Sequence, residues 1–275
     1  MTVMLAVLFA GNAFAVKKKT VKIAYVEWAC ATASSNVAKA VIEEKLGYTC
    51  ELIPVSAAAM YQALSTGDVD AITTAWLPVT HKDYMDKIKT TVVDLGPNLK
   101  GAKLGLVVPS YVTIDSVDQI NANAKKFKKQ IIGIDPGAGL MGMAEKALVT
   151  YDMKDMELME GSGAMMTAML GNAIKNNEWI VVTGWAPHWK FGRWDLKILK
   201  DPKGVFGSEE TVNTIVRKGL KEDLPDVNAF LDAFFWTTAD IGQIMVWNQD
   251  GMDPADSAKK WVKENPDKVA VWLKH

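Results

Sequence analysis

Apolar and polar positions alternate along the first part of the chain in a pattern that predicts two strands separated by a helix. Residues 21–27 and 50–55 are rich in apolar and β-branched side chains at strand spacing, and residues 34–46 between them have helical spacing. A strand, a helix and a strand in this order form a βαβ unit with parallel strands. The pattern therefore predicts that an α/β fold begins here.

The same alternation continues through the next 160 residues and then changes to helices alone. Residues 156–159 fit a strand or a short connector, residues 114–120 fit the start of a small helix, and Pro254 and Pro266 mark helix boundaries after Pro225. Further strands are predicted at residues 71–74, 104–108, 131–134, 179–183 and 211–216, and further helices at 61–66, 140–150 and 164–175. We expect an α/β fold with mostly parallel strands and a helical C-terminal stretch.

The first fifteen residues have the pattern of a secretory signal peptide. An apolar run at residues 3–10 is followed by Ala13-Phe14-Ala15, a small-x-small site that predicts cleavage after Ala15. The run is too short to span a bilayer, and no Cys at the cleavage site suggests a lipid anchor. No Lys or Arg precedes Val3, so either the true start lies upstream or the amino terminus alone supplies the positive charge. A buried N-terminal strand or helix is the alternative interpretation of the apolar run. We expect a soluble protein exported to the periplasm.

Composition narrows the classes of function. Among 275 residues, 49% are hydrophobic and 23% charged, which is typical of a globular protein, and the net charge of -1 offers no basic field for nucleic acid. Three His and two Cys leave too few ligands for a His/Cys metal site. No G-x-S-x-G elbow is present, no G-x-G-x-x-G loop opens the first predicted helix, and Gly137-Ala138-Gly139 is too short for a phosphate loop. We therefore expect no metal, no cofactor and no enzymatic activity, with a secreted small-molecule enzyme as a distant alternative.

Cys30 and Cys50 are expected to remain free thiols although export would expose them to an oxidising compartment. In the predicted βαβ unit, Cys30 follows the first strand, whereas Cys50 begins the second strand at the opposite edge of the sheet. Their Cα atoms should then lie well beyond the ~7 Å that a disulfide allows.

Tryptophan recurs where predicted strands end, at the edge where an α/β fold binds ligands. Trp28, Trp76 and Trp185 each follow such a strand. Indole faces attract cations, and a quaternary ammonium group, which donates no hydrogen bond, is held by aromatic surfaces. Any one Trp could instead fill the core, but the three together predict an aromatic cage. The tryptophans assigned to packing are Trp179, Trp194, Trp247, Trp261 and Trp272.

Four segments in the same order resemble the glycine betaine-binding proteins of ABC importers, over a match from about Val21 to the C-terminus. They are Ala-Trp-Leu-Pro-Val-Thr-His at residues 75–81, Gly-Ile-Asp-Pro-Gly-Ala-Gly-Leu-Met at 133–141, Thr-Gly-Trp-Ala-Pro-His-Trp at 183–189 and Phe-Trp-Thr at 235–237. The resemblance implies a two-lobed α/β fold of the type II periplasmic-binding-protein class with its ligand in the cleft between the lobes. It also implies delivery of a compatible solute to a membrane permease and ATPase complex.

The resemblance further implies a box of three tryptophans at Trp76, Trp185 and Trp236. From the residues alone, Trp236 lies in an aromatic stripe at helical spacing, which is more typical of a core position. Trp28 has no matched box position and is expected to be a fourth wall or a lid.

A betaine also carries a carboxylate, which related proteins hold with main-chain N–H groups and a polar side chain. By position, the N–H groups of Cys30, Ala31 and Thr32 at the start of the first helix are the candidates. His188 and His81 could donate as well or serve only as structural hydrogen bonders. Residues 237–242, where the family often has a His, contain none. Choline, proline betaine and a sulfonium analogue therefore stay open as ligands beside glycine betaine.

The lobes implied by the resemblance can be assigned to stretches of the sequence. Residues 16–109 together with 211–275 should form lobe I, and residues 110–210 should form lobe II. Residues 108–111 and 208–212 would be the hinges between them. We expect the protein to be a monomer.

Overall fold

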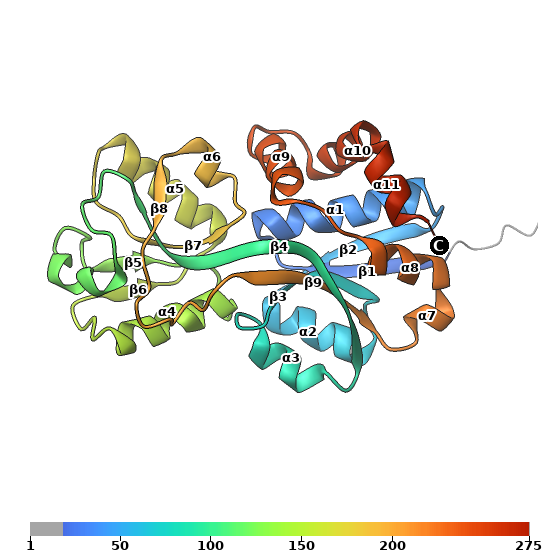
Figure 1. Cartoon of the computed structure of the whole chain (residues 1–275), viewed down its shortest axis with the longest axis horizontal. Coiled ribbons are helices and arrows are strands. Elements are labelled where there is room, and N and C mark those ends of the chain that lie inside the picture. The colour runs from blue at the N-terminus through green and yellow to red at the C-terminus, as the bar shows by residue number, and fades with distance from the viewer. Residues whose placement is uncertain (1–18, 275) are drawn as a thin grey trace, which may run out of the picture.

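The computed structural model describes residues 19–274, and the predicted signal peptide at residues 1–15 lies outside the described residues. Two lobes lie side by side, and two long strands run between them (Figure 1). The strands are β1 (Thr20–Tyr25), β2 (Thr49–Pro54), β3 (Ala71–Leu77), β4 (Val92–Pro109), β5 (Gln130–Ile132), β6 (Glu157–Met159), β7 (Val182–Ala186), β8 (Leu196–Ile198) and β9 (Glu210–Arg217). The helices are α1 (Ala29–Glu44), α2 (Ala57–Thr66), α3 (Lys82–Ile88), α4 (Gly139–Thr150), α5 (Gly163–Lys175), α6 (Lys190–Arg193), α7 (Leu220–Asp223), α8 (Pro225–Ala233), α9 (Thr238–Gln249), α10 (Pro254–Glu264) and α11 (Pro266–Trp272), with 3-10 turns η1 (Val117–Gln119) and η2 (Asn121–Asn123).

The strands follow the order β2-β1-β3-β9-β4-β7-β5-β6, and β8 pairs with β4. The two strands that connect the lobes, β4 and β9, pair antiparallel. Antiparallel pairs also join β3 to β9, β4 to β7 and β4 to β8, so the expectation of mostly parallel strands was wrong. The reason is topological, because the chain leaves the first lobe along β4 and returns along β9 in the opposite direction.

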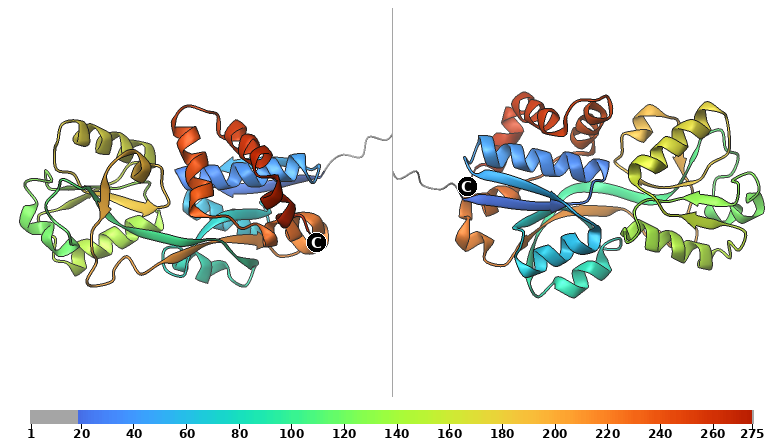
Figure 2. Two further views of the ribbon diagram at one scale, coloured as in Figure 1. Left: turned by 45° about the horizontal axis from the view of Figure 1, so that its top comes forward. Right: turned by 180° about the vertical axis from the view of Figure 1, so that it is seen from behind.

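Helices cover both faces of the sheet in each lobe. In lobe I, which holds β1, β2 and β3, helix α1 packs against the sheet with α9 and α10 beyond it, while α2 and α3 lie on the other side (Figures 1 and 2). In lobe II, which holds β5, β6 and β7, helices α4 and α5 lie on opposite faces of the strands (Figure 2). The predicted two-lobed α/β class is confirmed.

Helix α1 begins five residues earlier than the predicted 34–46. The predicted first residue, Ser34, lies inside the helix, and its side chain and that of Ser35 are buried. The Ser34 hydroxyl donates to the Thr73 hydroxyl of β3 at 2.9 Å, so it joins helix to sheet instead of capping the helix. The residue before the helix is Trp28, which is extended and makes no side-chain cap.

Strand β4 is much longer than the predicted 104–108. Its first half contains Gly96, Pro97 and Gly101, which interrupt the strand pattern in the sequence. In the structure these residues coincide with three register shifts against β9, between Asp94 and Gly96, between Pro97 and Leu99, and between Lys100 and Ala102. The bulges let the strand continue across both lobes.

The thiols lie where the βαβ unit predicts. Cys50 pairs in register with Val21 at the start of β1, and Cys30 lies in the first turn of α1, beyond the other end of β1. Both are buried and free.

The C-terminal stretch is helical as predicted, and Pro254 and Pro266 begin α10 and α11. Trp261 and Trp272 stack with ring centroids 5.7 Å apart, which confirms that they serve packing. Within residues 19–274, no helix is both long and apolar enough to cross a membrane.

Candidate functional site

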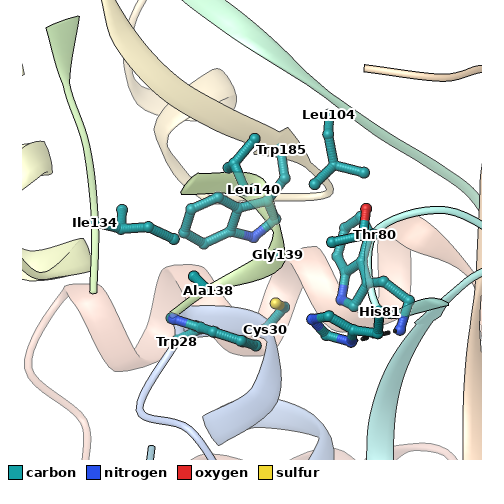
Figure 3. A pocket seen from close by; sticks show the side chains of 11 residues that line it. Trp28, Cys30, Thr80, His81, Leu104, Ile134, Ala138, Gly139, Leu140 and Trp185 are labelled. Carbon is teal, nitrogen blue, oxygen red and sulfur yellow. Dashed lines mark hydrogen bonds between the residues drawn. The ribbon is translucent and has the colours of Figure 1, made fainter. Parts of the chain in front are cut away.

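An apolar pocket lies where the two lobes meet. Figure 3 shows the indole rings of Trp28 and Trp185 and the imidazole of His81 facing this space. Lobe I contributes the start of α1 and the turn after β3, and lobe II contributes β7 and the start of α4. The lining residues are Trp28, Cys30, Trp76, Thr80, His81, Leu104, Ile134, Ala138, Gly139, Leu140 and Trp185.

The structure brings together the three tryptophans that the strand-end pattern singled out. Trp76 and Trp185 are the next-to-last residues of β3 and β7, so each lies inside its strand rather than after it, and Trp28 immediately precedes α1. Their exposed fractions are 6% for Trp28 and 4% for Trp76 and Trp185. The three side chains come from both lobes, so the pocket is complete only when the lobes are together.

Trp236 lies elsewhere. It follows the end of α8, and its backbone N–H donates to the Asn98 carbonyl at 3.0 Å. Its ring is 1% exposed and packs 5.2 Å from Phe234 and 5.9 Å from Trp261. The structure therefore places Trp236 in the aromatic core beneath α10, and Trp28 takes the third place at the pocket.

His81 presents one defined donor to the pocket. Its Nδ1 accepts a hydrogen bond from the Trp76 backbone N–H at 3.0 Å, which leaves the proton of the neutral ring on Nε2. Burial lowers the pKa of His81 to about 3, so the ring is neutral at ordinary pH. The ring also stacks on Trp28, with centroids 5.8 Å apart. His81 is therefore a neutral N–H donor fixed in place by the backbone of a neighbouring tryptophan.

The amino-terminal end of α4 forms another side of the pocket. Gly139 and Leu140 begin the helix after Ala138, and first-turn N–H groups have no partner within a helix. A Cβ on Gly139 would lie 2.1 Å from the Thr80 carbonyl oxygen, so only glycine allows this close approach of the two lobes. The positive end of the helix dipole thus lies at the pocket.

The main-chain donors expected on α1 are only partly at the pocket. Cys30 lines it, but Ala31 and Thr32 do not, and the Thr32 N–H donates to the Trp28 carbonyl at 2.8 Å. Because α1 begins at Ala29, Thr32 is already inside the helix and its N–H is taken.

His188 also lies outside the pocket. Its Nδ1 accepts from the Lys190 backbone N–H at 3.1 Å, and its ring meets the edge of Trp185 with centroids 4.8 Å apart. The helix predicted at 140–150 begins at Gly139, but its first residues were not among the predicted ligand-binding residues.

The pocket lining carries no negatively charged side chain. No Asp or Glu side chain lines the pocket, so a cation there would meet aromatic and other uncharged groups and no carboxylate. Elsewhere in the described part of the chain, no group of three or more His, Cys, Asp or Glu could hold a metal ion. The pocket can accommodate a small cationic group that has no hydrogen-bond donors. It can also accommodate an anionic group near α4 and His81.

Comparison with known proteins agrees with this geometry. Residues 19–264 match the family model described as the substrate binding domain of ABC-type glycine betaine transport systems. The glycine betaine/carnitine transport binding protein GbuC of Listeria monocytogenes is 51% identical over 144 residues, which are 52% of this chain and 48% of that protein. The match therefore spans about half the length of this relative.

Two solved structures resemble the whole fold. The glycine betaine, L-proline-binding protein ProX of Borrelia burgdorferi has a TM-score of 0.90 at 41% identity, covering 94% of this chain and 97% of that one. Lactococcal OpuAC, closed and complexed with glycine betaine, has a TM-score of 0.89 at 44% identity, covering 93% and 100%. The chain belongs to the family of substrate-binding domains of ABC-type glycine betaine transport systems.

Proposed function

We propose that this protein captures glycine betaine, or a close analogue, in the pocket of Trp28, Trp76 and Trp185 and delivers it to an ABC importer. The observation that carries the proposal is the convergence of three indole rings on a pocket whose lining has no acidic side chain. A primary ammonium would leave its N–H donors without acceptors in such a site. A quaternary ammonium has no such donors and gains from each aromatic face.

Hydrogen-bond donors at the pocket favour an anionic group on the same ligand. The first-turn N–H groups of α4 and the Nε2–H of His81 are donors, and the helix dipole adds positive potential there. A carboxylate would satisfy these donors with charge-assisted hydrogen bonds. Choline lacks the carboxylate, so it is the weaker candidate, as is a sulfonium compound without an acidic group.

Closure of the two lobes would hide the ligand from water. We assign residues 16–109 and 211–275 to lobe I and residues 110–210 to lobe II, with hinges near 108–111 and 208–212. Strands β4 and β9 connect the lobes, but the crossover in β4 lies a few residues before 108–111, because β4 pairs with β9 as far as Ala102 and with β7 of lobe II from Lys103 onward. Exclusion of water strengthens the attraction between a cation and an indole face.

Titration calorimetry of ligand-free protein tests the proposal. Glycine betaine and proline betaine should bind, and choline should bind at least about tenfold more weakly because it forms no ion-assisted hydrogen bond. Folded, ligand-free protein that binds none of these ligands would refute the function. Recovery of the ligand unchanged after incubation would separate a binding protein from an enzyme.

Export and transport are the remaining parts of the proposal. The apolar run at residues 3–10 and the Ala13-Phe14-Ala15 site support export to the periplasm with cleavage after Ala15. Action as a monomer is part of the proposal. Mass spectrometry of the secreted protein would locate the cleavage. Uptake of labelled glycine betaine by vesicles holding the permease and ATPase should require added binding protein.

A further inference from the structure

A buried lysine amine, that of Lys190, lies over the ring of Trp185. The Lys190 side chain is fully buried at 0% exposure, and its Nζ lies 4.8 Å from the centroid of the Trp185 ring. Within residues 19–274 no hydrogen-bond acceptor contacts this Nζ. A buried ammonium normally has a carboxylate or carbonyl partner, so this one is poorly stabilised when charged.

The surroundings of the Lys190 amine are apolar and tightly packed. A Cβ added at Gly184 would lie 3.0 Å from the Nζ and 2.5 Å from a Val107 methyl group, so the absence of a side chain at Gly184 leaves room for the amine. The Phe191 ring lies 5.7 Å from the Nζ. Lys190 does not line the ligand pocket, whereas Trp185 does, so the indole lies between the pocket and the amine.

We propose that Lys190 makes ligand affinity depend on pH: the pocket binds a quaternary ammonium group more tightly when the Lys190 amine is unprotonated. This inference rests on the proposed function and adds to it that protonation of Lys190 regulates ligand affinity. With Lys190 protonated, the Trp185 indole would contact two cations, the Lys190 ammonium and the quaternary ammonium of the ligand. Their like charges would repel each other strongly because the surroundings have a low dielectric constant. Ligand binding would then release the Lys190 proton to solvent.

The titratable groups around Lys190 allow this effect to be isolated. Burial lowers the pKa of Lys190 to about 7. The charged or titratable neighbours that act on it are the Cys30 thiol from α1, whose pKa burial raises to about 11, and His188, whose pKa burial lowers well below its usual range. His81 at the pocket has a pKa of about 3. Of these four groups, only Lys190 changes its charge between pH 6 and pH 9.

Calorimetry with glycine betaine at pH 6, 7, 8 and 9 measures the effect directly. If the bound ligand lowers the pKa of Lys190 by about one unit, affinity rises about fivefold from pH 6 to pH 9 and then levels off. Near pH 6.5, binding should release about half a proton, which is measured by repeating the titration in buffers of different ionisation enthalpy. The ligand's carboxylate stays ionised throughout this range.

Two variants complete the test. Lys190→Met keeps the length of the side chain without its charge and should bind with an affinity independent of pH and without proton release. The matched control is Lys126→Met, because the exposed Lys126 also lies over a tryptophan, 4.3 Å from the Trp179 centroid, but away from the pocket. This control should keep the pH dependence of the unmodified protein.

The outcomes separate this inference from the proposed function. A flat affinity profile without proton release in the unmodified protein would overturn it, and so would an unchanged pH dependence in Lys190→Met. The unmodified protein supplies a decisive result even where Lys190→Met does not fold. Failure to bind glycine betaine at every pH would remove the proposed function as well, whereas pH-independent binding would remove only this inference.

Discussion

The indole Nε1–H of Trp28 donates a hydrogen bond to the carboxylate of Asp135 at 3.1 Å. Trp28 belongs to lobe I and precedes α1, whereas Asp135 belongs to the lobe II segment that leads into α4. A second contact reaches the same segment, because the Tyr84 hydroxyl donates to the Gly137 carbonyl at 2.6 Å. The hydrogen bond between Trp28 and Asp135 therefore both joins the two lobes and orients the Trp28 ring at the pocket.

Replacing Asp135 should weaken ligand binding without unfolding the protein. Asp135→Ala leaves the Trp28 N–H without its charged acceptor in the closed state, a loss of about 1.5–3 kcal/mol, or roughly tenfold to a hundredfold in affinity. Calorimetry with glycine betaine measures the change. Asp232→Ala, at an exposed position of α8, is the control and should bind normally. Normal affinity in Asp135→Ala would show that the contact contributes nothing to binding.

Replacement of the tryptophans should lower ligand affinity at some positions and stability at others. Alanine at Trp28, Trp76 or Trp185 should lower affinity by about 1–3 kcal/mol, the scale of one desolvated indole face with its contact area. Alanine at Trp236 or Trp261 should instead lower the free energy of unfolding by about 3–5 kcal/mol, because each leaves a cavity in the aromatic core. Denaturant titrations and calorimetry on the five variants measure both effects.

Phenylalanine at the first three positions should keep more affinity than alanine, because a weaker aromatic face remains. A Trp236→Ala variant with normal stability and lost affinity would return Trp236 to the ligand box.

His81 should determine selectivity for the carboxylate rather than for the cation. His81→Leu removes the Nε2–H donor, so the affinity for glycine betaine should fall about tenfold or more, while the affinity for tetramethylammonium should change little. His81→Gln offers both an acceptor for the Trp76 N–H and a donor for the pocket, and it is the matched control. Equal losses for both ligands in His81→Leu would indicate a packing role only.

Stability should rise with pH above neutrality because of Lys190. Its pKa in the folded state, about 7, lies below the ordinary value of 10.5. The unfolded chain therefore binds more protons between these values, and the free energy of unfolding increases with pH by at most about 1.4 kcal/mol per unit. Urea titrations at pH 7, 8 and 9 should show this increase, and it should be absent in Lys190→Met. Above pH 9 the raised pKa values of Cys30 and Cys50 act in the opposite direction.

The thiols should be free but slow to react. Burial raises the pKa of Cys30 to about 11 and that of Cys50 to about 12, so little thiolate exists at pH 8. Both should be labelled in unfolded, unreduced protein, and mass spectrometry would show the two added groups. Because Cys30 lines the pocket, bound ligand should slow its labelling in the folded protein while leaving Cys50 unaffected. A mass two units below that of the reduced chain would instead reveal a disulfide.

Local pattern was enough for most elements and for the approximate places of the pocket tryptophans. The predicted strand 71–74 falls within β3, and the predicted strand 179–183 lies three residues before β7, because short β-rich runs bounded by Gly or Pro are a local signal but do not fix strand ends. Strand β4 was mostly missed, since its glycines and proline are accommodated by bulges against β9, a partner more than a hundred residues away. The start of α1 was misplaced because the partner of Ser34 is Thr73, which local spacing does not reveal.

The sequence by itself determined the α/β class, the free thiols and the gathering of Trp28, Trp76 and Trp185, because all three depend on the order of strands and on where strands end. Only the tertiary structure decided that Trp236 packs in the core and that His81 and the start of α4 face the pocket. It also decided that Lys190 lies against Trp185. The first two relationships join segments that are far apart in the sequence, and the third depends on how the turn between β7 and α6 folds back. The packing of the whole chain sets them, and no local spacing encodes that packing.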